Sequence, residues 1–242
     1  MNMIEYNVSD FDPAKVDFNS PFIVRSYGAD WLIKEILTFE NLESAFKNVV
    51  VPQTDMVDKT VFSATIREFF ERNRTGSNTY IQNWQFLLDL PELADTFAVP
   101  EQFRCFLDEF SLNEHIALEG SLLLSWAFIG LKGSHTTLHQ DVADTCAWNV
   151  SLSGRKSWDF YSPEFNPLSD KDTPITCIQN PCDLIYTPAN WWHRVENLEA
   201  SISITQNFIR TENLSSFGKF IKANFDELTS SLIEEREPKV FA

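Results

Sequence analysis

The stretch TTLHQDVADTCAWNVSLSGRKSW, at residues 136–158, decides how the whole chain is interpreted. It contains the motif His139-x-Asp141 in a segment with the composition of a β-strand. Side chains two residues apart on a strand point the same way, with Cα atoms roughly 6–7 Å apart. The imidazole and the carboxylate can therefore converge on one cation, although so short a motif also arises by chance.

A third candidate ligand, His193, follows the run TPANWW farther along the chain. Two imidazoles and one carboxylate on one face of an octahedral ion leave three positions open, which is typical of non-haem Fe(II) oxygenases. We therefore predict that His139, Asp141 and His193 bind a metal. His115 lies in the polar stretch SLNEH and is expected at the surface. A turn is expected at the run Gly133-Ser134-His135, so His135 is not expected to share a regular strand face with Asp141 and is also a weaker candidate.

The segments around these residues are short, β-rich and separated by Gly, Pro, Asn or Asp, which is typical of an antiparallel sandwich or barrel. Gly154 lies between two such segments and predicts a hairpin turn. The segments are SLLLSWAFIGL, CAWNVSL, KSWDFYS, CDLIYTP and SISITQNFI.

The segment SISITQNFI, at residues 201–209, has one polar and one apolar face. Alternate side chains of a strand point to opposite faces, so Ile202, Ile204 and Phe208 share one face. The polar face either lines a cavity, or belongs to an edge strand and meets water. Its members are Ser201, Ser203, Thr205 and Asn207.

The two ends of the chain have the patterns of helices. Apolar residues recur at helical spacing in WLIKEILTFENLESAFKN, while PFIVRSYG and the β-branched run at 49–51 predict strands. Ser63 is predicted to cap the helix SATIREFFERN, and Pro91 to begin another. A single apolar stripe is predicted near the C-terminus, formed by Leu214, Phe217, Ile221, Phe225, Leu228 and Leu232.

The 242 residues carry a formal net charge of −16, and no cluster of Lys and Arg is longer than two. The electrostatic field of so negative a chain repels phosphate backbones and attracts basic peptides, so nucleic acid is not an expected partner. Alternatively, the charge only keeps the chain in solution. No apolar run is long enough to cross a bilayer.

The four cysteines form no C-x-x-C pair and the first residues lack a signal-peptide pattern, so free thiols and a cytoplasmic location are expected. A second metal at Cys177 and Cys182 lacks nearby partners.

The quoted stretch resembles the JmjC pattern T-x-x-H-x-D, then W-N, then G-x-K-x-W. A second block, CDLIYTPANWWHRVENLEASISITQNF at 182–208, resembles the later JmjC elements P-x-x-W-W-H, N-L and I-T-Q-N-F. The strong likeness covers about residues 120–210. Within the JmjC family the chain is most similar to the lysyl 5-hydroxylases that were also proposed to be arginine demethylases.

The resemblance implies an α+β fold with a mainly β core. Residues 121–210 would form a double-stranded β-helix, that is, a jelly-roll or cupin barrel. Residues 1–120 would be an extension of helices and strands packed on this barrel, and residues 211–242 a C-terminal helical segment. This last segment either pairs with its copy in a homodimer or covers the barrel of its own chain.

The resemblance also implies that the chain binds Fe(II), 2-oxoglutarate and O2. Thr136 and Lys156 match positions that hold the distal carboxylate of 2-oxoglutarate, where an ammonium and a hydroxyl satisfy a buried anion. Asn149 and Thr205 match further polar positions, and Asn207 shares the face of Thr205. Lys156 could instead be solvated beyond the turn. Thr136 is three residues from His139, so a bulge or a strand end is needed to turn both inward.

The implied reaction is hydroxylation of an amino-acid side chain, lysine-like or other, in a protein or peptide, with succinate and CO2 as coproducts. Demethylation is a variant of the same chemistry. The alternatives are a hydroxylase of a free amino acid or of a modified tRNA base, and a non-catalytic JmjC or cupin barrel that binds metal as an interaction module. A cupin isomerase or a sugar-binding barrel would need more histidines and a glutamate.

Overall fold

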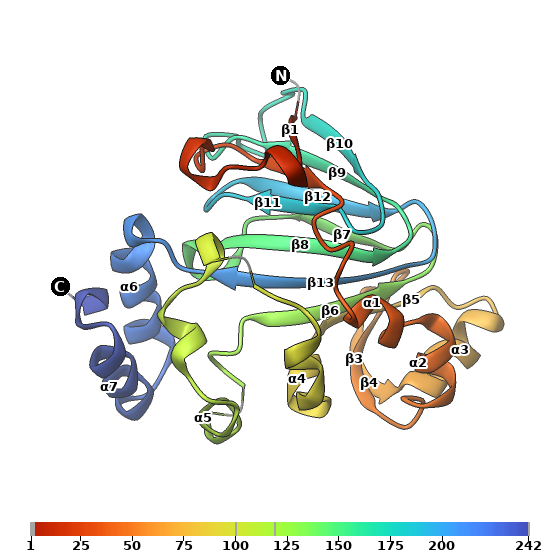
Figure 1. The fold of residues 1–242 in the computed structure, drawn as a ribbon. Helices are drawn as coiled ribbons and strands as arrows, with labels where there is room; N and C mark the ends of the chain where they lie inside the picture. Colours follow the sequence, from red (N-terminus) through yellow and green to blue (C-terminus); the bar gives the residue numbers. More distant parts are fainter. Residues whose placement is uncertain (1–2, 100, 119, 242) are drawn as a thin grey trace.

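The computed structural model describes residues 3–99, 101–118 and 120–241, which form two β-sheets flanked by short helices (Figure 1). The larger sheet has nine strands in the order β1-β2-β11-β8-β13-β6-β5-β3-β4. Their bounds are β1 (Ile4–Asn7), β2 (Phe22–Arg25), β3 (Val50–Asp55), β4 (Val61–Thr65), β5 (Thr79–Trp84), β6 (Ser125–Gly130), β8 (Cys146–Ser153), β11 (Leu184–Thr187) and β13 (Ser201–Phe208).

The smaller sheet has four strands in the order β10-β9-β12-β7. They are β7 (His135–His139), β9 (Lys156–Tyr161), β10 (Ile175–Gln179) and β12 (Trp192–Asn197). Apart from the parallel pair β1 and β2, the paired strands run antiparallel. Two large antiparallel sheets with added helices confirm the α+β, mainly β fold class and are compatible with a jelly-roll barrel.

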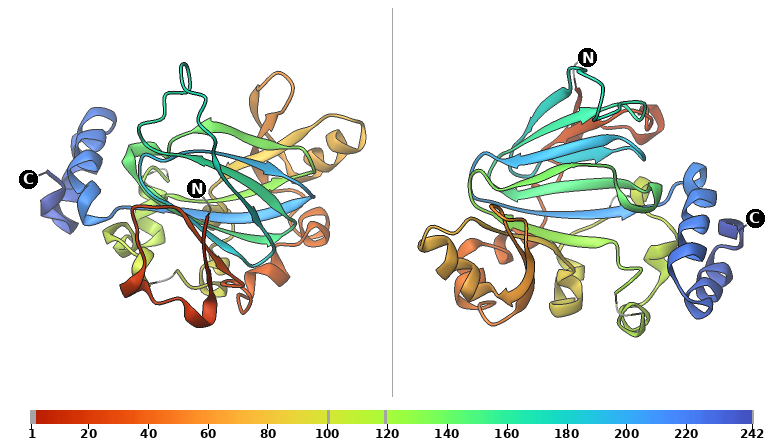
Figure 2. Two further views of the ribbon diagram at one scale, coloured as in Figure 1. Left: turned by 90° about the horizontal axis from the view of Figure 1, so that it is seen from above. Right: turned by 180° about the vertical axis from the view of Figure 1, so that it is seen from behind.

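Helices lie at both ends of the sheets, as Figures 1 and 2 show. At one end are α1 (Ile33–Ile36), α2 (Phe39–Ser44) and α3 (Ile66–Arg74), and at the other are α6 (Leu214–Asn224) and α7 (Glu227–Arg236). Between them lie α4 (Phe86–Asp89) and α5 (Leu112–Ala117). None of the helices in these described ranges is both long and apolar enough to cross a bilayer.

The central strands β8 and β13 are buried on both faces. Ile202, Ile204 and Phe208 belong to a large apolar core with Trp31 and Ile33 from the N-terminal part. The opposite face of β13 is also buried, and its residues Thr205 and Asn207 line a cavity. The apolar face of β13 is therefore covered by the N-terminal extension, which leaves the polar face for the interior.

The first 120 residues add strands to the barrel sheet. β2 pairs with β11, and β5 pairs with β6. The N-terminal part thus extends the sheet and also supplies helices against its outer face. The division of the chain at residues 120 and 210 stays a prediction. The four cysteines, Cys105, Cys146, Cys177 and Cys182, are free thiols, as expected.

The predicted hairpin at Gly154 is wrong. β8 pairs with β11 and β13, whereas β9 pairs with β10 and β12. The turn therefore carries the chain from one sheet to the other, and the turn composition alone cannot distinguish the two cases. Gly154 has φ +73°, and a Cβ atom there would lie 2.1 Å from the carbonyl oxygen of Ala200.

Two helix predictions are also corrected. Ser63 lies in β4, opposite Pro52, and the cap of α3 is Thr65. Thr65 and Glu68 form a capping box, which satisfies free N–H groups at the helix start. The C-terminal apolar stripe does not follow one helix, because α6 ends before Asp226, which caps α7. Leu228, expected in the stripe, is 65% exposed.

Candidate metal centre

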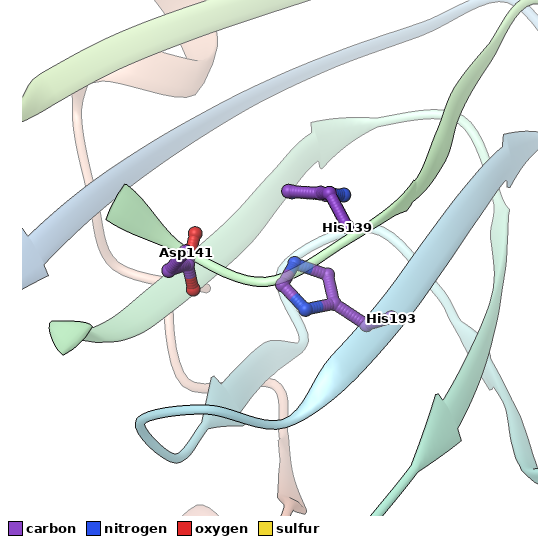
Figure 3. Close-up of side chains that lie close together, drawn as sticks. All are labelled: His139, Asp141 and His193. Carbon is purple, nitrogen blue, oxygen red and sulfur yellow. The ribbon is translucent and has the colours of Figure 1, made fainter. Parts of the chain in front are cut away.

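His139, Asp141 and His193 come together at one end of the smaller sheet (Figure 3). His139 is the last residue of β7 and lies opposite His193 of β12 in the sheet register. Asp141 follows two residues after His139 in extended conformation. One potential ligand atom from each residue lies within 4.8 Å of the others. The three side chains can therefore contact one ion.

The two imidazoles are held by backbone carbonyls. Nδ1 of His139 lies 2.8 Å from the carbonyl oxygen of Thr137, and Nδ1 of His193 lies 3.1 Å from that of Trp191. A carbonyl only accepts, so each Nδ1 carries the proton and each Nε2 keeps its lone pair. Such a contact is the usual way in which a metal-binding imidazole is oriented. The ring centroids are 4.2 Å apart.

The burial of His193 favours its metal-binding form. Burial lowers the pKa of His193, while the nearby Asp141 carboxylate opposes this shift. A neutral imidazole is the form that binds a metal. The Oδ2 atom of Asp141 is buried and finds no hydrogen-bond partner among the residues that the structure describes. A buried carboxylate oxygen without a partner is costly, and a cation beside it would remove that cost.

A bulge brings Thr136 to the same side as His139. In the pairing of β7 with β12, His193 lies opposite His139, whereas Val195 lies opposite Thr136. Two residues of β7, Thr137 and Leu138, thus lie opposite the single residue Arg194 of β12, and the extra residue reverses the expected alternation. Thr136 consequently lines the same cavity as His139, and its Oγ1 accepts a hydrogen bond of 3.3 Å from Gln82.

The five residues predicted to bind 2-oxoglutarate line one cavity of about 460 Å³ together with His139, Asp141 and His193. These five are Thr136, Asn149, Lys156, Thr205 and Asn207. The hydroxyl of Thr205 donates to the carbonyl oxygen of Trp148 at 2.6 Å, and Nδ2 of Asn207 donates to the hydroxyl of Thr145 at 2.8 Å. Both are thereby fixed on the cavity wall.

Lys156 is 2% exposed, so the alternative of a solvated lysine is wrong. Its ammonium donates a hydrogen bond to the hydroxyl of Ser203, and no carboxylate in the described ranges pairs with it. Burial lowers its pKa to about 7. An uncompensated buried ammonium is unfavourable, and an anion in the cavity would stabilise it.

The prediction for His115 is wrong, since the residue is buried in α5 beside Phe110. The SLNEH stretch is the start of the short helix α5, in which the polar residues Ser111 and Glu114 form a capping box. His135 contacts Lys59 and does not line the cavity, in agreement with its lower ranking.

Several residues of the site carry no signal in the sequence. Trp158 lines the cavity and stacks on His193 at a centroid distance of 6.0 Å. Gln82 and Trp126 reach the cavity from β5 and β6. Gln179 is fully buried behind Asn149. Only Ser203 had a usable signal, because it shares the polar face of Thr205.

A jelly-roll-type fold with two imidazoles and one carboxylate at its cavity defines the class: a β-protein with a candidate site for a single metal ion. No family model matches the chain. Among characterised proteins, it is 25% identical to "Arginine-specific demethylase JMJ20" of Arabidopsis thaliana over 98% of this chain and 62% of the relative. It is 30% identical to "Lysine-specific demethylase JMJ21" of the same plant over 60% of this chain.

A third relative is "2-oxoglutarate and iron-dependent oxygenase JMJD4" of Homo sapiens, which is 23% identical over 65% of this chain and 43% of the relative. The relatives of this chain are thus JmjC-type iron- and 2-oxoglutarate-dependent oxygenases, and the family resemblance seen in the two sequence blocks is confirmed. The chain spans less than two thirds of the length of each of these three relatives, and only 18% of JMJ21.

Proposed function

We propose that the protein is an Fe(II)- and 2-oxoglutarate-dependent dioxygenase that hydroxylates an amino-acid side chain in a protein or peptide. The observation that carries this proposal is the buried Oδ2 of Asp141, which has no hydrogen-bond partner among the described residues, in a carboxylate that lies with two oriented imidazoles within reach of one ion. This set of ligands suits a ferrous ion with open positions. The names of the relatives support the same reaction class.

In this proposal Nε2 of His139, Nε2 of His193 and the carboxylate of Asp141 hold the ion. When bound, Fe(II), 2-oxoglutarate and O2 supply the oxidation of an unactivated C–H bond, with succinate and CO2 as coproducts. The protein orients its two imidazoles through the carbonyls of Thr137 and Trp191 and places them in a cavity lined by residues of both sheets.

Lys156 and Thr136 bind the distal carboxylate of 2-oxoglutarate in this proposal. Both line the cavity, and Lys156 has the unpaired charge that a carboxylate would complement. A hydrogen bond from the Lys156 ammonium to this carboxylate is charge-assisted and therefore short and strong. Asn149 supplies a further amide N–H, and Thr205 and Asn207 complete the polar wall.

The proposed substrate is a polypeptide segment with a lysine-like or other side chain. The relatives' names specify lysine or arginine, and the net charge of −16 favours the approach of basic peptides. Demethylation would be the same C–H hydroxylation on an N-methyl group. A cytoplasmic location and a homodimer through the C-terminal helices are further proposals. Phe217 and Ile221 of α6 and Ile233 of α7 pack within their own chain, so the exposed Leu228 of α7 is the apolar side chain offered to a dimer contact.

The first test is spectroscopic. Fe(II) and 2-oxoglutarate, added together without O2, should give a visible charge-transfer band that neither gives alone. We expect His139→Ala and Asp141→Ala to abolish the band, because each removes a ligand to the ion. His135→Ala is the matched control, since His135 lies on the same strand outside the cavity.

The outcomes separate the competing functions. Wild-type protein with neither the band nor succinate formation would end the oxygenase proposal. A band without any succinate in air would instead favour a metal-binding interaction module. Mass spectrometry of peptide, amino-acid and tRNA mixtures for products heavier by one oxygen atom would then distinguish the substrate classes.

A further inference from the structure

Gln179 is a buried residue behind the cavity that links its two sheets. It ends β10, lies opposite Lys156 in the register and has no exposed surface. Its Oε1 accepts a hydrogen bond from Nε1 of Trp158 at 2.8 Å. Its Nε2 lies 3.0 Å from Oδ1 of Asn149, 3.1 Å from the carbonyl oxygen of Asn149 and 3.0 Å from that of Asp183. One amide thus contacts β8, β9 and the turn before β11.

The chemistry of its neighbours fixes which way this amide points. An indole N–H only donates and a backbone carbonyl only accepts, so Oε1 of Gln179 must face Trp158 and Nε2 must face the carbonyls. Nε2 has two N–H groups for these three oxygens, so one N–H is shared, and Oδ1 rather than the Nδ2 of Asn149 must face it as an acceptor. The Asn149 amide is therefore locked with Nδ2 on the other side, 3.5 Å from the Ser203 hydroxyl that also accepts from Lys156.

This orientation matters for an anion in the cavity. With Nδ2 turned toward Ser203 and Lys156, Asn149 adds an N–H donor beside the ammonium. If the Asn149 amide turned over, its carbonyl oxygen would lie there instead and repel a carboxylate. Donors fixed before the ligand arrives bind more tightly, because they need no reorganisation.

The same amide holds the indole of Trp158 against the metal centre. Trp158 stacks on Phe160 at 5.6 Å and on His193 at 6.0 Å, with interplanar angles of 7° and 23°. The anchor of Gln179 is itself rigid. The carboxylate of Asp183 accepts from Nη1 of Arg25 at 2.7 Å and from the backbone N–H of Ser26 at 2.9 Å.

We propose that Gln179 is a positioning residue, which contacts neither metal nor cosubstrate but fixes Asn149 as a hydrogen-bond donor toward the carboxylate of 2-oxoglutarate. This inference rests on the proposed function. It assigns a specific role to a residue that lies outside the cavity wall and that no motif in the sequence indicates.

The test is anaerobic titration of the Fe(II)-loaded protein with 2-oxoglutarate, followed by the visible band. We expect Gln179→Met to raise the Kd of 2-oxoglutarate about tenfold, because Asn149 loses the bond that orients it. Gln53→Met is the matched control. Gln53 is equally buried and donates to the carbonyls of Ala64 and Thr65, but it does not line the cavity. It should lower Tm comparably and leave the Kd unchanged.

A double-mutant cycle tests whether Gln179 acts through Asn149. In an Asn149→Ala background, Gln179→Met should have no further effect on the Kd, since the amide that it orients is absent. If the two substitutions instead raise the Kd by independent factors, so that the double variant shows their product, the proposal is overturned. If Gln179→Met does not fold, Gln179→Leu replaces it. Its apolar side chain adds no charge and offers Asn149 no N–H, so a raised Kd is again expected.

The result also separates this inference from the proposed function. A wild-type protein without the band would overturn the oxygenase proposal and this inference with it. A wild-type band together with an unchanged Kd in Gln179→Met would overturn the role of Gln179 alone.

Discussion

Lys156 is the residue whose charge depends most on what occupies the cavity. It is buried with a hydroxyl as its hydrogen-bond partner, and its pKa is lowered to about 7 by that burial. An unfolded chain keeps the lysine charged up to about pH 10. The ligand-free protein therefore carries a destabilising group that a bound carboxylate would turn into a stabilising one.

This difference predicts how Lys156→Met changes stability with pH. Between pH 7 and about 10 the unfolded state holds the proton and the folded state has lost it, so wild-type stability rises with pH in that window. Without 2-oxoglutarate, Lys156→Met should raise the free energy of unfolding by up to a few kcal/mol at pH 7 or below. The substitution replaces a buried charged side chain with an apolar one of similar volume. The gain should shrink toward pH 10.

Urea unfolding at pH 6.5 and pH 9.5 measures this effect. Lys132→Met, at an exposed lysine, is the control and should change little at either pH. A gain from Lys156→Met that stays constant across the range would contradict the lowered pKa. The same variant should bind 2-oxoglutarate more weakly than the wild type, so stability and cosubstrate affinity should move in opposite directions.

At the scale of elements, the crossing between β8 and β9 depends on Gly154. Its φ of +73° is unfavourable for other residues, and an added Cβ would meet the carbonyl oxygen of Ala200 at 2.1 Å. Gly154→Ala should therefore destabilise the protein by more than the ~1–2 kcal/mol of the left-handed backbone alone. Gly76→Ala is the control for the cost of the left-handed backbone alone. Gly76 has φ +95°, and a Cβ atom added there would have no neighbouring atom within 4 Å.

Thermal unfolding of the two glycine variants compares them directly. We expect Gly154→Ala to have the lower Tm. Equal losses in the two variants would show that the neighbouring backbone moves aside and that the contact with Ala200 carries no cost.

The start of α3 offers a second test at this scale. Thr65 accepts from the backbone N–H of Glu68 at 3.2 Å, and Oε2 of Glu68 accepts from that of Thr65 at 2.8 Å. Thr65→Ala should cost about 1 kcal/mol of stability. Ser63→Ala is the control, because Ser63 is an exposed strand residue. A larger loss from Ser63→Ala in urea unfolding would restore the cap predicted from sequence.

At the scale of the whole molecule, metal binding should be visible as stability. His139 and His193 come from two strands that are distant in the chain, so an ion between them stabilises only the folded state. At a concentration of 100 times its Kd, a ligand adds about 2.7 kcal/mol. For a chain of this size that corresponds to about 5–10 °C in Tm.

Mn(II) is a suitable probe because it binds oxygen and nitrogen ligands without reacting in air. We expect it to raise the Tm of the wild type and of His135→Ala, but not that of Asp141→Ala. An equal rise in Asp141→Ala would mean that the ion binds elsewhere, for example on the acidic surface.

Local chemistry let the sequence predict the fold class and the residues that meet at the site. Alternation in SISITQNFI predicted a polar face, and the spacing of His139 and Asp141 predicted side chains on one side. The resemblance to JmjC proteins then indicated Lys156 and Asn149. These features could be predicted because each depends on neighbours along the strand or on a motif of fixed spacing.

Only the tertiary structure decided which sheet each strand joins, where β7 bulges and what lies behind the cavity wall. Gly154 connects two sheets because β9 pairs with β12, and such long-range pairing leaves no mark in the turn itself. Gln179 matters because Trp158 and Asn149 lie beside it in space. The physical reason is that hydrogen bonds between distant segments depend on the packing of the whole chain, whereas strand alternation and helix caps are set within a few residues.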